Sequence, residues 1–258
     1  MVECRTVNSD VPGSRPGGAA RVVYNSYIEV KQQGRYKMLN SNMPTPRPYK
    51  EHRFFERYLD NDLEELSRFL EKKYEMIENA TLPGVTSMEK DKGIFLESGS
   101  LSTVKWKEYN VFQFYHASLY KLQKAISDTV KEACEYYDVD FDKQNYYMQG
   151  WFNINRAEVG KLDYHDHGSP GAPNFHGYYC VNAEPSITHY KLFNDPSRIV
   201  DNINKNNRLV VSEVGHPHAM GDWDWSGPRI TIAYDVQPLS VILAAGKTIP
   251  EQHWFPLL

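Results

Sequence analysis

Two histidines one residue apart are the most chemically suggestive pair in this sequence. His165 and His167 end the segment Asp-Tyr-His-Asp-His, which begins at Asp163. Imidazole is the commonest metal ligand among protein side chains, and residues at i and i+2 of an extended segment point to the same side. One metal ion could therefore be bound by both. The turn-forming residues that follow, from Gly168 to Pro173, also fit a solvated polar loop.

Two more histidines and an arginine lie about fifty residues downstream. His216 and His218 follow a predicted strand, and Pro217 between them favours extended backbone, so either imidazole could face a metal. Arg229 opens another predicted strand, and Thr231 shares its face by alternation. A guanidinium donates two parallel hydrogen bonds to a carboxylate, and a nearby hydroxyl can add a third. This strand therefore predicts a site for an anionic ligand.

These motifs, taken in order, resemble those of the iron(II)/2-oxoglutarate-dependent oxygenase superfamily, and most closely a poorly characterised group of 2OG-Fe(II) oxygenases within it. The resemblance covers roughly residues 145 to 237 and does not extend over the first half of the chain. The matching elements are Trp151-Phe152-Asn153, Gly160, His165-Asp166-His167, Tyr178-Tyr179, Phe193-Asn194-Asp195-Pro196, His218 and Arg229-Ile230-Thr231.

The resemblance implies a role for each matching polar residue. His165, His167 and His218 would bind iron(II). Arg229, helped by Thr231, would bind the distal carboxylate of the cosubstrate 2-oxoglutarate, whose oxo-acid end chelates the metal, and O2 would take the remaining position. The implied reaction is oxidation, most simply hydroxylation, of a C–H bond in a small organic substrate such as an amino acid or a natural-product intermediate. No catalytic side chain is expected beyond the metal ligands.

The second ligand position departs from the usual facial triad of two histidines and one carboxylate. His167 stands where the superfamily has Asp or Glu. Three neutral ligands would leave the ferrous ion its full charge and strengthen the binding of an anionic cosubstrate. Alternatively, Asp166 or Asp163 supplies the carboxylate and one histidine supports it. The i+2 spacing from His165 favours His167, because Asp166 should point away.

Two further hypotheses fit the same residues. One is a cupin-type three-histidine metalloenzyme that does not use 2-oxoglutarate, in which Arg229 binds an anionic substrate directly. The other is a non-enzymatic jelly-roll protein with a binding or structural role.

Other histidines and aromatic residues give weaker indications. His176 and His189, on neighbouring predicted strands, are expected to be packed or hydrogen-bonded rather than to bind metal. The segment from Ala219 to Gly227 is either a loop folded onto the barrel or a lid over the substrate. The candidate pocket-lining residues are Gln149, Trp151, Asn153, Tyr178, Trp223 and Trp225. The histidines that give no indication are His52, His116 and His253.

The elements that must hold these residues are two helices followed by short strands. Apolar residues at steps of three and four predict a first helix from Phe55 to Ile77, with a break allowed near residue 60, where Asp62 and Glu65 fit a helix cap. The second predicted helix is Ala117–Tyr137. The predicted strands are Val22–Val30, 145–155, His176–Val181, Ile187–Phe193, Arg208–Val214, Arg229–Val236 and Ser240–Leu243.

This order of elements predicts an α+β fold, and histidines among the strands favour a double-stranded β-helix (jelly-roll or cupin-like) core with flanking helices. Residues 1–20, rich in Gly, Pro, Ser and Arg, are interpreted as a flexible tail. Residues 21–258 are interpreted as a single oxygenase domain, with a helical scaffold at about 50–140 and the jelly-roll half at about 145–245.

Composition limits the classes of partner. A net charge of −4 without a basic block lacks the charge pattern of a nucleic-acid-binding protein. Cys4, Cys134 and Cys180 are widely spaced and form neither a disulfide framework nor a zinc motif. Since the sequence has no signal-peptide or membrane-length apolar run, we expect a cytoplasmic protein with a small-molecule substrate and no membrane partner. The sequence does not indicate an oligomeric state.

Overall fold

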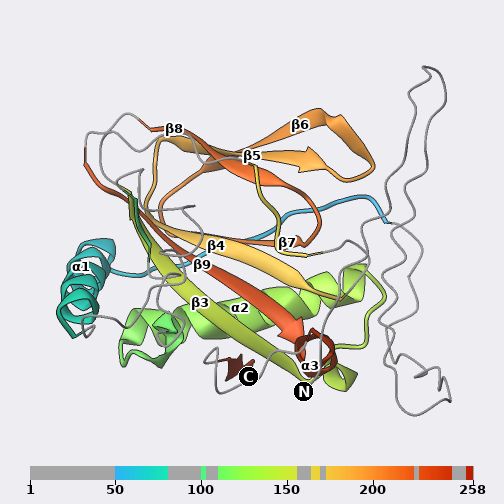
Figure 1. The fold of residues 1–258 in the computed structure, drawn as a ribbon, viewed down its shortest axis with the longest axis horizontal. Helices are drawn as coiled ribbons and strands as arrows, with labels where there is room; N and C mark the ends of the chain where they lie inside the picture. Colours follow the sequence, from blue (N-terminus) through green and yellow to red (C-terminus); the bar gives the residue numbers. More distant parts are fainter. Residues whose placement is uncertain are drawn as a thin grey trace, which may run out of the picture. The chain divides into compact units, whose positions relative to one another are not determined.

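Two antiparallel β-sheets are stacked in the computed structural model of this chain, and helices cover the outer side of the larger sheet (Figure 1). The structure describes residues 50–80, 100–102, 110–155, 164–168, 173–223, 227–245 and 254–257. All of them belong to one compact unit, Asn42 to Leu258. The predicted tail and the strand predicted at Val22–Val30 lie outside the described residues, so the domain boundaries stay a prediction.

The elements alternate between helices and strands up to residue 143, after which strands dominate. In chain order they are β1 (Phe55–Tyr58), α1 (Leu63–Ala80), β2 (Ser100–Ser102), the 3-10 helix η2 (Val111–Gln113), α2 (Ala117–Tyr136), the 3-10 helix η3 (Phe141–Lys143), β3 (Tyr146–Asn155), β4 (Phe175–Asn182), β5 (Ser186–Leu192), β6 (Asp195–Asn204), β7 (Arg208–Glu213), β8 (His218–Trp223), β9 (Arg229–Pro238), α3 (Leu239–Ala244) and β10 (Phe255–Pro256).

The sheet topology is that of a double-stranded β-helix. The larger sheet has the order β1-β7-β4-β9-β3-β10, with β2 also paired to β3, and the smaller has the order β6-β5-β8. An antiparallel bridge between His165 and His218 extends the smaller sheet beyond β8. From β3 to β9 the chain passes back and forth between the sheets, as in a jelly roll. The predicted fold class is therefore confirmed.

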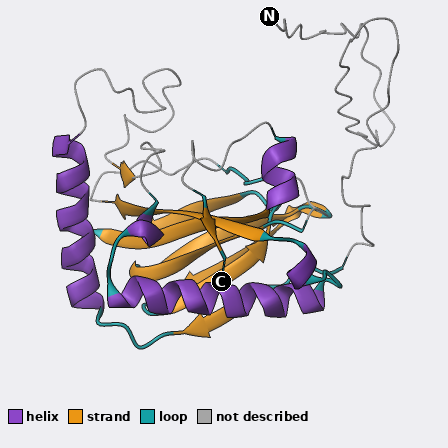
Figure 2. Cartoon of the chain, turned by 90° about the horizontal axis from the view of Figure 1, so that it is seen from below, coloured by secondary structure: helices purple, strands orange, loops and turns teal. Residues whose placement is uncertain are grey.

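Helix α2 lies across the outer face of the larger sheet (Figure 2). It packs against β1 and β7, while α1 packs against β4. Leu122, Ile126 and Val130 are fully buried on the inner stripe of α2, where they join Phe152 and Ile232 from the sheet in one apolar cluster. The second predicted helix is thus confirmed, with its apolar stripe on the sheet. No helix in the described part of the chain is long and apolar enough to cross a membrane.

The first predicted helix begins later than expected. Phe55–Tyr58 forms β1, because these residues pair with the edge of β7. Helix α1 begins only at Leu63, where the Oδ1 atom of Asp62 accepts a hydrogen bond from the Glu65 N–H at 2.9 Å. The break allowed near residue 60 is therefore present, and Asp62 caps the helix as predicted.

Further elements also differ from the prediction. The segment Ser240–Leu243 was predicted to be a strand and lies in helix α3. A run of four apolar residues does not distinguish a strand from a short helix, and Pro238 ends the ladder of β9 because it has no N–H to donate. Strands β6 and β8 were not predicted, because β6 is mostly exposed and β8 is a short mixed sequence that starts at His218.

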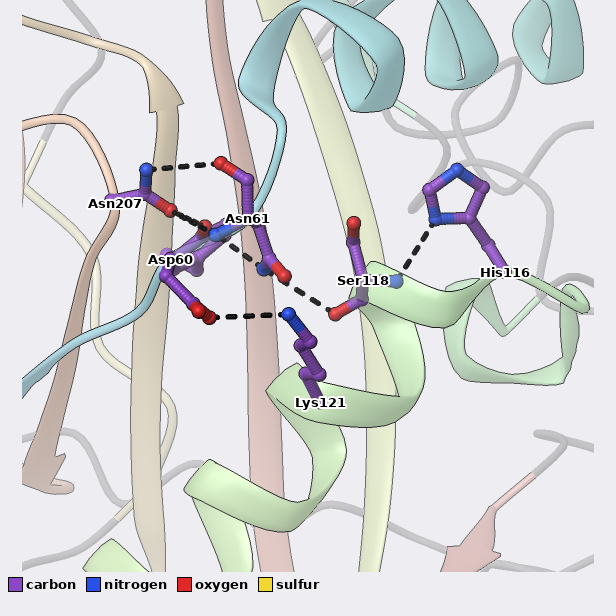
Figure 3. A network of polar contacts seen from close by, with 7 residues as sticks. Asp60, Asn61, His116, Ser118, Lys121 and Asn207 are labelled. Atoms are coloured by element: carbon purple, nitrogen blue, oxygen red, sulfur yellow. Dashed lines mark hydrogen bonds and ion pairs between the residues drawn. The ribbon is translucent and has the colours of Figure 1, made fainter.

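A network of amides fixes the start of α1 against the turn before β7 (Figure 3). The Asn61 N–H donates to Asn207 Oδ1 at 3.2 Å, and Asn207 Nδ2 donates back to the Asn61 carbonyl at 3.2 Å. Asn61 Nδ2 donates to the Ser118 carbonyl at 3.4 Å and to the Tyr179 hydroxyl at 3.1 Å. Asn207 has a φ of 64°, which Asn tolerates better than most residues. The network ties both helices to the sheet.

Gly177 gives a test of this packing. It lies in β4 between β7 and β9, where an added Cβ would meet the Val210 carbonyl oxygen and the Tyr234 hydroxyl. Those two groups are hydrogen-bonded at 2.7 Å. We expect Gly177→Ala to lower the free energy of unfolding by about 1–3 kcal/mol, measured by chemical denaturation, because the strands must shift apart.

The control is Gly227→Ala. The nearest atom to its added Cβ is Asn182 Nδ2, at 3.9 Å. This variant should stay within about 0.5 kcal/mol of the wild type. An equally small effect at Gly177 would contradict the packing described here.

Candidate metal centre

Three histidines gather at one end of the space between the two sheets. His165, His167 and His218 each offer a ligand atom, and these atoms all lie within 4.8 Å of one another. Nitrogens bound to one ion at about 2.1 Å lie about 3–4 Å apart, so small side-chain rotations suffice to hold one ion. Among the described residues, this is the only group of three or more His, Cys, Asp or Glu side chains with this proximity.

Backbone hydrogen bonds bring two of these histidines side by side. The His165 N–H donates to the His218 carbonyl at 3.1 Å, and the His218 N–H donates to the His165 carbonyl at 2.8 Å. Residues paired in this way point to the same side of a sheet. His167 follows His165 by two residues, so alternation brings it to that side as well.

The competing candidates lie elsewhere. Asp166 is exposed, and its Oδ1 atom faces the Gly168 N–H at 3.4 Å. His216 Nδ1 accepts a hydrogen bond from the Phe193 N–H at 3.0 Å, and its ring packs 3.9 Å from that of His52. Asp163 lies outside the described residues. The geometry thus groups His218 and His167 with His165, and their role as ligands remains a prediction.

His167 is held on several sides. Its Nδ1 atom lies 2.8 Å from Asp235 Oδ1. Its ring stacks on Trp151, with centroids 5.8 Å apart and an interplanar angle of 17°. Burial alone would lower the pKa of His167, but the carboxylates of Asp235 and Asp166 outweigh it and raise that pKa. A hydrogen bond to Asp235 from Nδ1 leaves Nε2 as the nitrogen available to a metal.

His176 is packed, as predicted, but against the candidate ligands. Its ring lies parallel to those of His167 (5.0 Å, 4°) and His218 (4.6 Å, 11°). Burial, together with the neighbouring histidines, lowers its pKa well below the ordinary value, so the ring is neutral. His189 is hydrogen-bonded, as predicted, with Nδ1 2.6 Å from Asp201 Oδ1.

A buried guanidinium lies at the other end of the same space. Arg229 is only 6% exposed, and its Nε donates to Ser186 Oγ at 3.2 Å. None of the acidic side chains that the structure describes forms an ion pair with it. Burial lowers its pKa. Thr231 is also buried, with its Oγ1 3.5 Å from Asn153 Nδ2.

A row of side chains on the inner faces of β9 and β4 extends from the histidines to Arg229. Alternation sends Ile230, Ile232, Tyr234 and Val236 into the cluster beneath α2, so the intervening residues of β9 face the smaller sheet. The paired residues along this route are Asp235 with His176, Ala233 with Tyr178, and Thr231 with Cys180. Asp235 and Arg229 are six residues apart, about 20 Å of strand.

The predicted pocket residues lie on this route or beside it. Tyr146, Met148, Phe152 and Ile154 belong to the cluster beneath α2, so Gln149, Trp151 and Asn153 are on the opposite face of β3. Tyr178 packs between the sheets. Trp223 belongs to β8 rather than to a loop, is 5% exposed, and donates its Nε1–H to the Gly227 carbonyl at 2.8 Å. Trp225 lies outside the described residues.

Sequence reasoning gave no role to Asp235 or His52. Asp235 lies six residues after Arg229 on one predicted strand, so alternation places both on the same face, and this shared face was a usable signal. No signal in the sequence pointed to His52, because its contact with His216 joins residues that are 164 positions apart.

His52 and His216 predict acid sensitivity of the metal-free protein. Burial, and then the charge of His216, lowers the pKa of His52 to about 3. Burial lowers the pKa of His216 to about 4. The unfolded chain binds a proton at each below about pH 6.5, so between these limits it holds more protons than the folded chain, and stability falls as the pH falls. In denaturant titrations between pH 7 and 4.5, His52→Phe should reduce this dependence by up to about 1.4 kcal/mol per pH unit. An unchanged dependence would show that His52 is not buried as a neutral ring.

Comparisons with known proteins give matches to solved structures only; no family model and no curated sequence matches. One match is the "non-heme alpha ketoglutarate dependent carbocyclase SnoK from nogalamycin biosynthesis", at 9% identity and a TM-score of 0.47, covering 72% of this chain and 79% of that one. A Pseudomonas putida prolyl-4-hydroxylase matches at 14% and 0.47, covering 72% and 93%. EvdO2 from Micromonospora carbonacea var. aurantiaca, complexed with 2-oxoglutarate, matches at 12% and 0.45, covering 82% and 94%. At these sequence identities and TM-scores, the function has to be argued from the site itself.

Proposed function

We propose that this chain is a non-haem iron(II)- and 2-oxoglutarate-dependent oxygenase that oxidises, most simply hydroxylates, a C–H bond of a small organic substrate. One observation carries the proposal: a group of three imidazoles and a buried guanidinium without a carboxylate partner in the described residues share one inter-sheet space. The first is a donor set for a metal, and the second requires an anion.

The three histidines fit a divalent transition metal. Imidazole suits iron, zinc and copper, whereas magnesium and calcium prefer oxygen donors. The ligand atoms come from a short segment and a strand that are hydrogen-bonded to each other, so the group is largely preformed. His165 is exposed and the other two are half-buried. The metal would therefore lie at the mouth of the inter-sheet space, open to a substrate from outside.

The guanidinium fits the far end of an elongated anion. Leaving a charge buried without a counterion is costly, so a ligand carboxylate beside Arg229 would relieve a real penalty. About 20 Å of β9 separates the backbone of Asp235 from that of Arg229, so the long Arg229 side chain must reach toward the metal for one small ligand to touch both. A five-carbon dicarboxylate such as 2-oxoglutarate, with an oxo-acid at one end and a carboxylate at the other, would then bind the metal and the guanidinium together. Thr231 offers a hydroxyl near its distal end, while Ser186 Oγ accepts the hydrogen bond from Arg229 Nε and so helps to hold the guanidinium in place.

The chain's own residues would bind the metal and the cosubstrate, orient them, and keep water away from them. Iron(II) with 2-oxoglutarate and O2 supplies the oxidising chemistry. Arg229 fixes one end of the cosubstrate, and the three histidines fix the metal, so the position of the reacting centre is set by the rigid strands. The buried walls at Tyr178 and Cys180 keep water from the cosubstrate. Trp151, beside His167, offers an aromatic surface to the substrate at the mouth.

A second function has one observation in its favour. The group of three ligands includes no carboxylate, unlike the usual triad of these oxygenases. A three-histidine metalloenzyme that does not use 2-oxoglutarate, with Arg229 on an anionic substrate, is therefore the alternative.

Anaerobic spectroscopy separates the two functions. With the first, mixing the apoprotein with Fe(II) and 2-oxoglutarate should give a visible charge-transfer band between metal and cosubstrate. His165→Ala should weaken or abolish iron binding and the band. His189→Ala is the matched control, because that imidazole pairs with Asp201 away from the group, and it should leave both unchanged.

Each other result has a definite meaning. Stoichiometric iron without the band would favour the metalloenzyme that does not use 2-oxoglutarate. A wild-type protein that takes up no metal would contradict both functions and leave a non-enzymatic jelly-roll protein.

Arg229 gives a prediction that depends on the cosubstrate alone. Arg229→Ala should abolish 2-oxoglutarate turnover with near-normal iron content, because the residue binds the cosubstrate and not the metal. Loss of two charge-assisted hydrogen bonds corresponds to about 3 kcal/mol or more, and so to a roughly 100-fold or greater weakening of 2-oxoglutarate binding in calorimetry. Arg229→Lys should be intermediate, since it keeps the charge but not the two-pronged contact. Loss of iron from Arg229→Ala would show that the residue has been assigned wrongly.

A further inference from the structure

We propose that Asp235 is a positioning residue of the metal centre, which supplies through His167 the negative charge that a carboxylate ligand supplies in the usual facial triad. This inference rests on the metal site proposed above and extends it to a residue outside the three ligands. It explains how a carboxylate can act electrostatically on a metal whose three ligands are neutral, without binding the metal itself.

The contact is short and largely buried. Asp235 Oδ1 lies 2.8 Å from His167 Nδ1, and the two side chains are 17% and 14% exposed. A carboxylate only accepts hydrogen bonds, so the proton of a neutral His167 is on Nδ1 and the lone pair is on Nε2. Histidine ligands commonly donate their second ring N–H to a carboxylate in this way, which fixes the ring and makes the bound nitrogen more basic.

His218 shows the same arrangement with a weaker acceptor. Its Nδ1 atom lies 3.3 Å from the carbonyl oxygen of His216. Both histidines therefore have Nδ1 beside an acceptor and Nε2 left for a metal. The difference is charge: His218 faces a neutral carbonyl and His167 faces a carboxylate. Asp235 would thus strengthen one ligand of the three electrostatically.

The position of Asp235 is fixed by the sheet. Its strand, β9, lies between β3 and β4, where Asp235 pairs with Gln149 on one side and with His176 on the other. Trp151 and His176 lie parallel to the His167 ring. The imidazole cannot turn far without disturbing these neighbours, so its ion-pair contact with Asp235 is preorganised.

Asp235 is not grouped with the ligands themselves. The ligand atoms of His165, His167 and His218 lie within 4.8 Å of one another, and no carboxylate oxygen of the described residues joins that group. Asp235 reaches only the back of the His167 ring. Its effect on the metal is therefore transmitted through the imidazole.

The test is metal binding to the full-length apoprotein with Asp235→Asn, which keeps the shape of the side chain and removes its charge. We expect the dissociation constant for Co(II), and for Fe(II) under anaerobic conditions, to rise about 10–100-fold. The Fe(III)/Fe(II) midpoint potential should rise as well, because the oxidised ion loses a nearby negative charge. The intensity of the Co(II) d–d bands, which reports coordination number, should stay the same.

Asp201→Asn is the matched control. Asp201 forms the same kind of pair with His189, at 2.6 Å, away from the metal group. This variant should leave the affinity and the potential unchanged. Thermal unfolding of both apo variants separates an effect on the metal from an effect on folding, and a purely structural role for Asp235 would not move the potential of bound iron.

The outcomes distinguish this inference from the proposed function. If the wild type binds metal and Asp235→Asn binds it equally well at the same potential, the role of Asp235 is refuted while the metal site stands. If the Co(II) band intensity shows that a ligand is lost in Asp235→Asn, Asp235 is itself a ligand and the positioning role is refuted. If the wild type binds no metal, the proposed function fails and this inference fails with it.

Discussion

The candidate site depends on two backbone hydrogen bonds between His165 and His218. They join a short segment to the start of β8, and so bring together residues more than fifty positions apart in the chain. Every other feature of the metal group follows from this pairing: His167 reaches the same side by alternation, and its ring then meets Asp235 and Trp151 on the opposite sheet. The site is thus a contact between the two sheets rather than a property of one loop.

The two faces of the larger sheet have opposite character. Beneath α2 the cluster is almost entirely apolar, whereas the inter-sheet face holds buried polar groups without hydrogen-bond partners in the described part of the chain, among them Tyr190 Oη and His176 Nε2. Each such group costs about 1–3 kcal/mol of stability. The apolar face offsets that cost, and a polar ligand between the sheets would relieve it. This difference between the two faces explains how the fold can be stable although polar groups between the sheets lack hydrogen-bond partners when no ligand is bound.

The sequence predicted what local periodicity can reveal. Strands β3 and β9 were found because one face of each is uniformly apolar and belongs to the cluster beneath α2, and α2 was found because its own apolar stripe belongs to the same cluster. Strand β6 was missed because it is mostly exposed and therefore has no uniformly apolar face. Strand β8 was missed because its six residues mix polar and apolar types without a clear period. The grouping of His165, His167 and His218 was predicted from spacing and resemblance. The contact between Asp235 and His167 could not be, because it depends on the distance between two sheets.

Charge balance connects the two ends of the inter-sheet space. A divalent metal ion on three neutral imidazoles beside Asp235 would carry one net positive charge, and Arg229 adds a second at the far end. A dicarboxylate lying between them brings two negative charges, one for each end, and leaves the buried space neutral. A monocarboxylate would leave one positive charge uncompensated in a region of low dielectric, where that is costly. If Asp235 were instead a neutral residue, the metal end would attract the oxo-acid more strongly but would hold the oxidised metal less well. Under the proposed function, the charges at the two ends of this space therefore favour a dianion over a monoanion.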